Sequence, residues 1–457
     1  MSRADRERRD AERAADDAVR EVYQGILSRS PEHDIEPTLD RVLAVCELMG
    51  DPQKAFRTVH LTGTNGKTST SRMVDRLVRE HGLRTGRFTS PHLTSVRERI
   101  AIDGEPISAE RFVEVWRDVA PYVHLVDTRS AAAGGPRLSF FEVLTVMAFA
   151  AFADAPIDVA IIEVGMGGVW DATNVVDGEV AVITPIALDH QRWLGHDLIS
   201  IAGEKSGIIK DSAALIMAVQ TEDVEGVLLA AAAARGARVV REGVDIDVTE
   251  RSVAVGGQLV SLRGLGGIYT EVFLPLYGAH QAHNALLALV ATEALLTGGA
   301  ALDGDVVGAA FADVDSPGRL EVLRSSPTIL VDAAHNPAGI AALVEGVEEA
   351  FDFTRLVGVV GVLADKDAEQ VLAGLEPLLA EIVITRSSSP RSFDVVDLAE
   401  IAIDVFGEDR VHAVERLDDA IDLAVQRAES EEQYGAGVLV TGSITMVADA
   451  RILLGRG

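Results

Sequence analysis

The sequence predicts an α/β protein with two domains, each built on a mostly parallel sheet. Short β-branched runs alternate with amphipathic or Ala/Leu-rich helical stretches, an order that is typical of parallel sheets covered by helices. A chain of 457 residues, 48% of them hydrophobic, can bury a large core and is long enough for about two domains. The predicted strands are residues 58–62, 158–164, 180–186, 328–331, 356–363, 382–385 and 438–441.

Three segments are predicted in chain order. Residues 1–30 carry charges of both signs and predict a solvated helix. Residues 31–315 form the larger domain; within it, the glycine-rich alternation of residues 239–270 predicts a small excursion of antiparallel hairpins, before a helix from about 280 to 296. A Ser-Pro-Gly turn then precedes a fresh α/β series, so residues 316–457 form a smaller, Rossmann-like domain.

Charge and cysteine content limit the classes of function. A formal charge of −30 argues against general attraction to nucleic acid or an anionic membrane, but not against small anionic substrates. The single cysteine, Cys46, excludes an intramolecular disulfide and suits a reducing cytosol. The chain shows no signal-peptide core and no apolar run near the ~20 residues that span a bilayer. We therefore expect a soluble cytoplasmic monomer without membrane or nucleic-acid partners.

A phosphate-binding loop is predicted between the first strand and a helix that runs through Met73 and Val78. Its glycines let backbone amides reach phosphate oxygens, Lys67 can reach the outer phosphates, and the hydroxyl of Thr68 can bind magnesium. Leu61 replaces the first glycine of the general pattern, so the loop is a shortened variant, and an ordinary glycine-rich turn is the alternative. The residues expected to bind ATP are Gly63, Thr64, Asn65, Gly66, Lys67, Thr68 and Ser69. The larger domain is thus a P-loop-type ATPase domain, although the loop alone does not exclude GTP.

Five further motifs follow the loop. They are residues 89–93 (Thr-Ser-Pro-His-Leu), 163–174 (Glu-Val-Gly-Met-Gly-Gly-Val-Trp-Asp-Ala-Thr-Asn), 189–190 (Asp-His), 204–210 (Glu-Lys-Ser-Gly-Ile-Ile-Lys) and 332–337 (Asp-Ala-Ala-His-Asn-Pro). Together these motifs resemble folylpolyglutamate synthase and dihydrofolate synthase, within the Mur ligase superfamily, from about residue 35 to the C-terminus. Thr68 departs from the family's usual glycine and matches the cell-wall Mur ligases, which remain the alternative.

The resemblance implies a ligase that uses ATP and two magnesium ions to activate a carboxyl group as an acyl phosphate and join it to L-glutamate. The acceptor would be dihydropteroate, a reduced folate, or both. An ATP-driven switch that does not ligate is a second alternative. Such a switch would not need the pair Asp332 and His335 or a pterin-lining segment, so the sequence favours an enzyme.

A metal site is also implied by the resemblance. Glu163 ends an apolar strand, where a carboxylate can hold magnesium against the β- and γ-phosphates, although a turn-capping acid is the alternative. Ser90 and His190 are further ligands by resemblance, and chemistry adds Thr68. Lys205 resembles the lysine that the family carbamylates to place a negative charge beside the second metal, with an ordinary salt-bridged lysine as the alternative.

The remaining expected residues contact ATP or the pterin. By resemblance, Asn284 contacts the adenine side of ATP, and Arg319 reaches its phosphate from the second domain. Helix capping and an interdomain salt bridge are the alternatives. The expected catalytic residues are Lys67, Lys205, Asp332 and His335, and Asp332 is also expected to bind ATP. Two segments match the pteroate pocket, and core packing is the alternative for their paired phenylalanines. These segments comprise Ser139, Phe140 and Phe141, and Trp170, Asp171 and Ala172.

Overall fold

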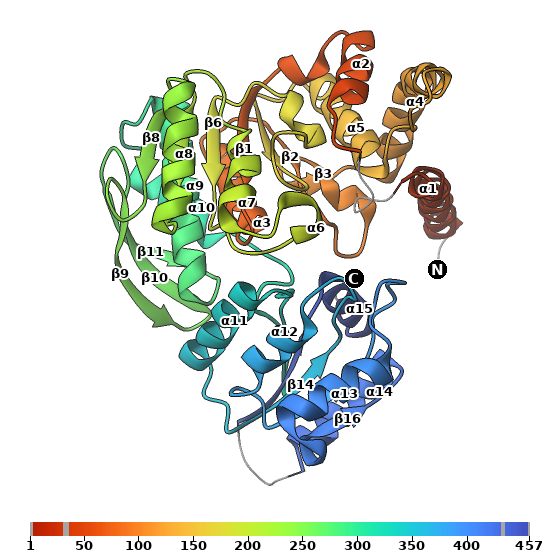
Figure 1. Ribbon diagram of the computed structural model, residues 1–457, viewed down its shortest axis with the longest axis vertical. Helices are drawn as coiled ribbons and strands as arrows, with labels where there is room; N and C mark the ends of the chain where they lie inside the picture. The colour runs from red at the N-terminus through yellow and green to blue at the C-terminus, as the bar shows by residue number, and fades with distance from the viewer. Residues whose placement is uncertain (1–2, 31–35, 431–434, 456–457) are drawn as a thin grey trace. The chain divides into compact units, whose positions relative to one another are not determined.

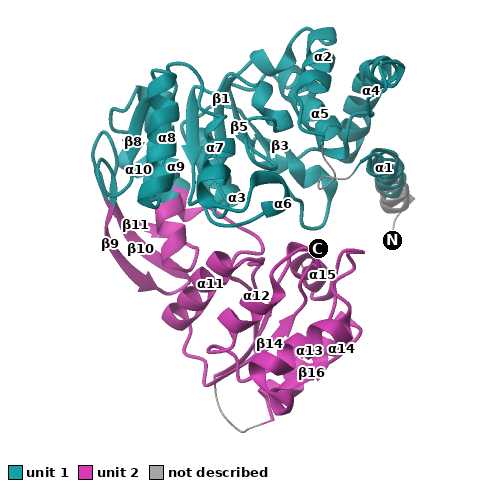
Figure 2. Cartoon of the chain, viewed as in Figure 1, with its two compact units in different colours: residues 1–247, 263–269, 285–310 teal, residues 248–262, 270–284, 311–457 magenta. Residues whose placement is uncertain are grey.

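The computed structural model describes residues 3–30, 36–430 and 435–455. Parts of all three predicted segments, at residues 1–2, 31–35, 431–434 and 456–457, lie outside the described residues. The chain divides into two compact units, coloured separately in Figure 2. Unit 1 comprises residues 1–247, 263–269 and 285–310, and unit 2 comprises residues 248–262, 270–284 and 311–457.

Unit 1 is built on an eight-stranded sheet (Figure 1) with the strand order β4-β3-β2-β5-β1-β6-β7-β8. The six strands from β2 to β8 in this order are parallel, and β3 and β4 are antiparallel at one edge. All residues of β5 and β6 are buried, as expected for parallel strands covered on both faces. The strands are β1 (Arg57–Thr62), β2 (Thr85–Phe88), β3 (Ile100–Ile102), β4 (Glu105–Pro106), β5 (Val159–Glu163), β6 (Val180–Ile183), β7 (Ala214–Met217) and β8 (Arg238–Arg241).

Helices connect and cover these strands, which confirms the predicted α/β class. Helix α3 contacts β1, β2 and β5, and α5 contacts β2 and β3. Within the described residues, every helix is too short or too polar to cross a membrane. The α-helices of this part of the chain are α1 (Arg3–Leu27), α2 (Asp40–Leu48), α3 (Lys67–Glu80), α4 (Ala109–Ala132), α5 (Phe140–Asp154), α6 (Gln191–Leu194), α7 (Leu198–Ser206), α8 (Glu222–Ala234) and α10 (Gly304–Ala312). Short 3-10 turns are η1 (Pro52–Lys54), η2 (Val96–Arg99) and η3 (Ala172–Val175).

The N-terminal helix forms as predicted but is not simply solvated. It packs against α4 (Figure 1), and its residues Val19 and Ile26 are buried in the core of unit 1. Beyond the helix, Arg29 forms a buried ion pair with Asp127 of α4, with 2.9 Å between Nη2 and Oδ2. The high charge of the segment obscured an apolar stripe of helical period, which is what attaches the helix to the domain.

The β excursion begins later than predicted. Residues 239–241 belong to β8, the parallel edge strand of the large sheet, and not to a hairpin. The separate three-stranded sheet has the order β11-β10-β9. Its strands are β9 (Asp247–Ala254), β10 (Gly257–Arg263) and β11 (Ile268–Leu274). Only two residues join β9 to β10, so this pair is a hairpin, as expected. Helix α9 (Ala279–Thr297) follows within one residue of its predicted bounds.

Unit 2 contains a six-stranded sheet with the order β12-β13-β17-β14-β15-β16. Only β12 is antiparallel to its neighbour, so the smaller Rossmann-like sheet is mostly parallel, as predicted. The strands are β12 (Glu321–Ser325), β13 (Thr328–Val331), β14 (Arg355–Val360), β15 (Glu381–Ile384), β16 (Val411–Ala413) and β17 (Ala436–Thr441). The helices are α11 (Pro337–Ala350), α12 (Ala368–Leu375), α13 (Val395–Phe406), η4 (Glu408–Arg410), α14 (Leu417–Ala428) and α15 (Ile444–Leu453).

Candidate functional site

Four neighbouring strands of unit 1 lead into predicted site residues at their carboxyl ends. Strand β2 precedes Ser90, β5 ends at Glu163, β1 runs into the loop of residues 63–69, and β6 precedes His190. These strands are adjacent in the order β2-β5-β1-β6 and run parallel, so their carboxyl ends lie at one edge of the sheet. Ligands of open α/β sheets bind at this edge.

The loop between β1 and α3 is held open by two glycines. The φ angle of Gly63 is 146°, and a Cβ there would lie 1.8 Å from the side-chain oxygen of Thr184, so no side chain fits. Gly66 has a φ of 91° and is the N-cap of α3. The hydroxyl of Thr64 donates to the carbonyl of Ala187 at 3.0 Å, which ties the loop to the segment after β6. The backbone amides at the start of α3 therefore face the loop, as a phosphate site requires.

Two lysines converge on one carbonyl of this loop. The Nζ of Lys67 donates to the carbonyl of Gly63 at 3.1 Å, and the Nζ of Lys205 donates to the same oxygen at 2.7 Å. Burial and the nearby charge of Lys67 lower the pKa of Lys205 to about 7, although the carboxylates of Asp189 and Asp171 oppose this shift. Lys205 is therefore a buried amine that is readily available in its neutral form near neutral pH.

The predicted metal ligands provide one carboxylate and one imidazole. The hydroxyl of Thr68 donates to both oxygens of the buried Glu163, at 2.9 and 3.1 Å. His190 follows β6 in a left-handed conformation, its Nε2 3.9 Å from an oxygen of Asp189. Across the part of the chain that the structure describes, no three His, Cys, Asp or Glu side chains form a metal cluster. Mg²⁺ is often bound by one or two carboxylates together with substrate phosphates, and this donor set fits that mode.

The residues at the start of α5 have structural roles in capping the helix and packing the core. Ser139 is the N-cap of α5: its hydroxyl accepts from the amide of Glu142 at 3.2 Å, and the carboxylate of Glu142 accepts from the amide of Ser139 at 2.6 Å. Phe140 and Phe141 are both buried in the core of unit 1, and the ring centroid of Phe141 is 5.6 Å from that of Phe88. The two rings thus contribute to core packing, whatever further contact they make.

Asp171 organises the loop that contains it. Its carboxylate accepts from the amide of Met166 at 2.9 Å and from both the amide and the hydroxyl of Thr173. Burial raises the pKa of Asp171 to about 6, although these hydrogen bonds lower it. Behind it, the Nε2 of the fully buried His60 lies 2.9 Å from the hydroxyl oxygen of Thr173, and burial lowers the pKa of His60 to about 3. A neutral imidazole on β1 therefore supports this loop. Of the flanking residues, Ala172 is buried and Trp170 is half-buried.

The predicted residues of unit 2 also have local partners. The carboxylate of Asp332 accepts from the amides of Leu320 and Ala334 at 2.7 and 2.8 Å. Burial raises its pKa, while the charge of Arg319 lowers it. The Nδ1 of His335 lies 2.9 Å from the carbonyl of Ala333. In α9, the side chain of Asn284 donates to that of Gln281 at 3.1 Å, inside the helix and not at its N-cap.

Sequence reasoning missed a side chain that shapes the segment after Ser90. The carboxylate of Glu98 accepts from the amides of Leu93, Thr94 and Ser95 at 2.8, 2.9 and 2.7 Å. Burial would raise the pKa of Glu98, but these hydrogen bonds bring it below its ordinary value. The pattern Ser95-Val-Arg-Glu98 is a capping box and was the available signal in the sequence.

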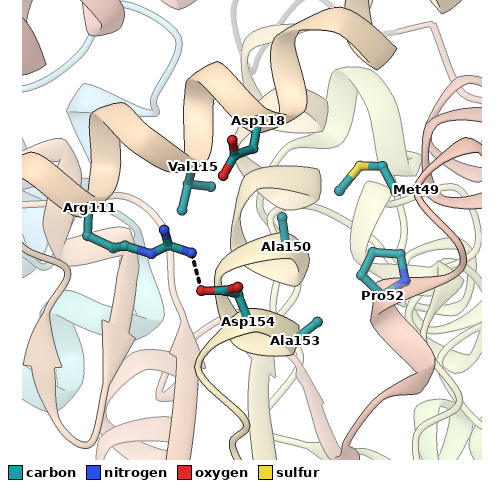
Figure 3. Close-up of a pocket in the computed structure, with 8 residues that line it drawn as sticks. All are labelled: Met49, Pro52, Arg111, Val115, Asp118, Ala150, Ala153 and Asp154. Atoms are coloured by element: carbon teal, nitrogen blue, oxygen red, sulfur yellow. Dashed lines mark hydrogen bonds and ion pairs between the residues drawn. The ribbon is translucent and has the colours of Figure 1, made fainter.

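A cavity of about 350 Å³ lies elsewhere in unit 1 (Figure 3). An ion pair between Arg111 and Asp154 lies within its wall, with 2.5 Å between Nη2 and Oδ2. None of the predicted site residues lines it. The lining residues are Met49, Pro52, Arg111, Val115, Asp118, Ala150, Ala153 and Asp154.

Two stretches of the chain match described protein families. Residues 112–292 match the Mur ligase middle domain, and residues 318–444 match the Mur ligase glutamate ligase domain. The chain is 51% identical over 449 residues to the dihydrofolate synthase/folylpolyglutamate synthase of Mycobacterium tuberculosis, covering 94% of this chain and 92% of that protein. The protein of the same name from Bacillus subtilis is 31% identical over 422 residues, which is 91% of this chain and 95% of that protein.

Two solved structures are also similar to this chain over more than nine tenths of its length. The structure of M. tuberculosis folylpolyglutamate synthase complexed with ADP and AMPPCP matches with a TM-score of 0.93 and 49% identity, covering 97% of this chain and 99% of that one. The structure of E. coli FolC in complex with DHPP and ADP matches with a TM-score of 0.79 and 29% identity, covering 92% of this chain and 94% of that one.

Proposed function

The chain belongs to the dihydrofolate synthase/folylpolyglutamate synthase family of Mur ligases, and on this basis we propose that it joins L-glutamate both to dihydropteroate and to reduced folates. It is an ATP-dependent ligase. The observation that carries the proposal is the convergence of Lys67 and Lys205 on the carbonyl of Gly63, at the strand edge that also carries Glu163.

The proposed reaction has two steps, phosphoryl transfer and then amide formation. A carboxylate oxygen of the pterin substrate attacks the γ-phosphorus of ATP, the bond from that phosphorus to the bridging oxygen breaks, and ADP leaves. The glutamate amine then attacks the acyl carbon, the bond from carbon to the phosphate oxygen breaks, phosphate leaves, and the amine loses a proton. Such phosphoryl transfer depends mainly on positioning and charge stabilisation, so no side-chain nucleophile is required.

The residues of the loop supply positioning and charge. The amides of residues 63–69 and the ammonium of Lys67 are proposed to bind the phosphates, which stabilises charge that develops on the transferred group. Glu163, Thr68, Ser90 and His190 are proposed to hold two magnesium ions. Bound magnesium would neutralise phosphate charge at this edge.

Lys205 is proposed to be carbamylated, and its buried position supports this. Its neutral amine can attack the carbon of CO₂, forming an N–C bond and releasing a proton, and the product is an anion suited to a metal site. Since the pKa of Lys205 is about 7, the neutral fraction grows as pH rises through that value. At a fixed concentration of dissolved CO₂, we expect protein freed of CO₂ to regain activity faster at about one pH unit above 7 than at one unit below.

Lys210→Arg is the control for replacing a nearby lysine by arginine. Labelled bicarbonate is expected to give a carbamate NMR signal in the wild type and in Lys210→Arg, but not in Lys205→Arg. Lys210 is a suitable control because it is half-buried, and its Nζ donates to the carbonyl of Asn174 at 2.8 Å. A carbamate signal that survives in Lys205→Arg would place the modification elsewhere.

The remaining roles follow the family resemblance. Asn284 is proposed to contact adenine; Arg319, Asp332 and His335 are proposed to act on the transferred phosphate. The pterin contacts are proposed for Ser139, Phe140, Phe141, Trp170, Asp171 and Ala172. Ser139 is also the N-cap that fixes the start of α5. The domain division at residue 315 is supported by the family matches, which fall on either side of it.

The test is magnesium-dependent ADP release from ATP and L-glutamate with dihydropteroate, with tetrahydrofolate, or with no pterin. We expect turnover with both pterins and only background release without them. Turnover with a single pterin would reduce the proposal to one synthase activity. Background release in every tube, from folded protein that binds ATP, would remove the folate assignment and favour a cell-wall Mur-type acceptor.

A further inference from the structure

Two aromatic rings contact Tyr23 of helix α1, and Arg99 contacts both of these rings, all within unit 1. The ring of Tyr23 meets that of His92 edge-on, with centroids 5.9 Å apart and an interplanar angle of 80°. It meets the ring of Phe140 in the same manner, at 6.0 Å and 72°. Arg99 links these two partners: its Nε donates to Nδ1 of His92 at 2.9 Å, and its Cζ lies 5.1 Å from the centroid of Phe140. We call these four residues the Tyr23 cluster.

The main chain after α1 is attached to the same place. The amide of Phe140 donates to the carbonyl of Ser30 at 2.9 Å. Arg29 donates from Nη1 to the carbonyl of Leu138 at 3.0 Å, and its buried ion pair with Asp127 fixes the guanidinium. The end of α1 is therefore connected to the start of α5 by rings, by a buried charge and by a backbone hydrogen bond.

The cluster lies between two segments that the proposed function uses. His92 belongs to residues 90–93, which begin with the proposed metal ligand Ser90, and Phe140 begins the proposed pterin wall. Edge-to-face and cation–π contacts depend on orientation, so they fix the direction of a ring as well as filling space. An aliphatic side chain of similar size would fill the space without fixing the rings.

We infer that Tyr23 is a positioning residue: held between His92 and Phe140, it orients the ring of Phe140 for the pterin, so the N-terminal helix is part of the substrate-specificity machinery. This inference rests on the proposed function. Tyr23 acts through its two ring contacts and does not itself need to touch the pterin. ATP is proposed to bind through residues 63–69, which are separate from these contacts, so the effect of losing Tyr23 should be specific to the pterin.

The test is steady-state kinetics of Tyr23 variants of the full chain. Tyr23→Leu is expected to raise the KM for dihydropteroate by about tenfold, because two oriented aromatic contacts are lost, with a smaller change in kcat and an unchanged Kd for ADP. Tyr23→Phe keeps both ring contacts, so its KM for dihydropteroate is expected to stay near that of the wild type. Tyr23→Ile serves as the second aliphatic variant if Tyr23→Leu does not fold, because isoleucine also lacks a ring that could orient its neighbours.

A stability control separates positioning from simple loss of packing. Val45→Ala removes buried volume from the same core but lies on α2, outside the N-terminal helix and the Tyr23 cluster, so it is expected to lower the Tm without raising the KM for dihydropteroate. An unchanged KM in the aliphatic Tyr23 variants, or an equal rise in Val45→Ala, would overturn the inference while leaving the proposed function in place. Wild-type protein without pterin-dependent turnover would overturn both.

Discussion

Replacement of Lys67 by Met is expected to lower kcat for pterin-dependent ADP release by about 100- to 1,000-fold, the usual effect of losing one preorganised charge-stabilising donor. The Nζ of Lys67 lies at the phosphate loop, 3.1 Å from the carbonyl of Gly63, where it can reach the transferred phosphoryl group. Methionine keeps most of the aliphatic chain but has no charge. Because Lys67 is only half-buried, the Tm should change little. Single-turnover ADP release at saturating ATP measures the effect on chemistry directly.

Lys54→Met is the matched control. Lys54 lies in the same domain, its side chain is 55% exposed, and it pairs only at the surface with Asp51, at 3.0 Å. Surface ion pairs of this kind contribute little to stability, so both the Tm and kcat should stay near the wild-type values. If Lys67→Met retained turnover within a few-fold of the wild type, the loop would not perform the phosphoryl transfer that we propose.

The Glu163→Gln variant is expected to need at least roughly 100-fold more magnesium for half-maximal activity, since even changes beyond the direct ligands weaken metal binding by up to that factor. An amide is a neutral ligand and binds a hard divalent cation more weakly than a carboxylate does. Glutamine keeps the shape of the side chain and can still accept the hydrogen bond from Thr68, which in the wild type is 2.9 Å long. The loss should therefore appear in a magnesium titration of ADP release, with folding preserved.

Glu179→Gln controls for the loss of a carboxylate from a residue next to a strand of the same sheet. Glu179 precedes β6, is 45% exposed at its side chain, and forms a surface ion pair with Arg57, with 2.8 Å between Oε2 and Nη2. Its magnesium dependence should match that of the wild type. An unchanged titration in Glu163→Gln would instead support the simpler interpretation of Glu163 as a turn-capping acid.

Local sequence patterns were sufficient to predict much of the fold and the family to which the chain belongs. All seven strands predicted from β-branched runs are present, with bounds that differ by a few residues, because a buried parallel strand leaves a continuous apolar run in the sequence. The family membership inferred from the motifs is confirmed. The loop of residues 63–69 could be predicted because its strand, glycines, lysine and helix are contiguous in the chain.

The sequence was ambiguous where one local pattern fits two structures. Residues 239–241 (Val-Val-Arg) are a short run that suits a hairpin strand as well as the edge strand of a parallel sheet, and only the pairing of β8 with β7 decides between them. The start of α5 also allows two interpretations: Ser139 forms a capping box with Glu142, and its contact with the pterin stays a prediction. The site roles of the aromatic residues remain predictions.

The sequence by itself determined the fold class, the phosphate loop and the family, because each depends on residues that are close together in the chain or on motifs in a fixed order. Only the tertiary structure decided which distant groups meet. Thr68 contacts Glu163 because β1 and β5 are neighbours in the sheet, and Tyr23 contacts His92 and Phe140 because α1 packs on the large domain. The physical reason is that burial and side-chain contacts depend on how helices and strands pack together. A local sequence pattern specifies neither the order of strands in a sheet nor the position at which a helix packs on the domain.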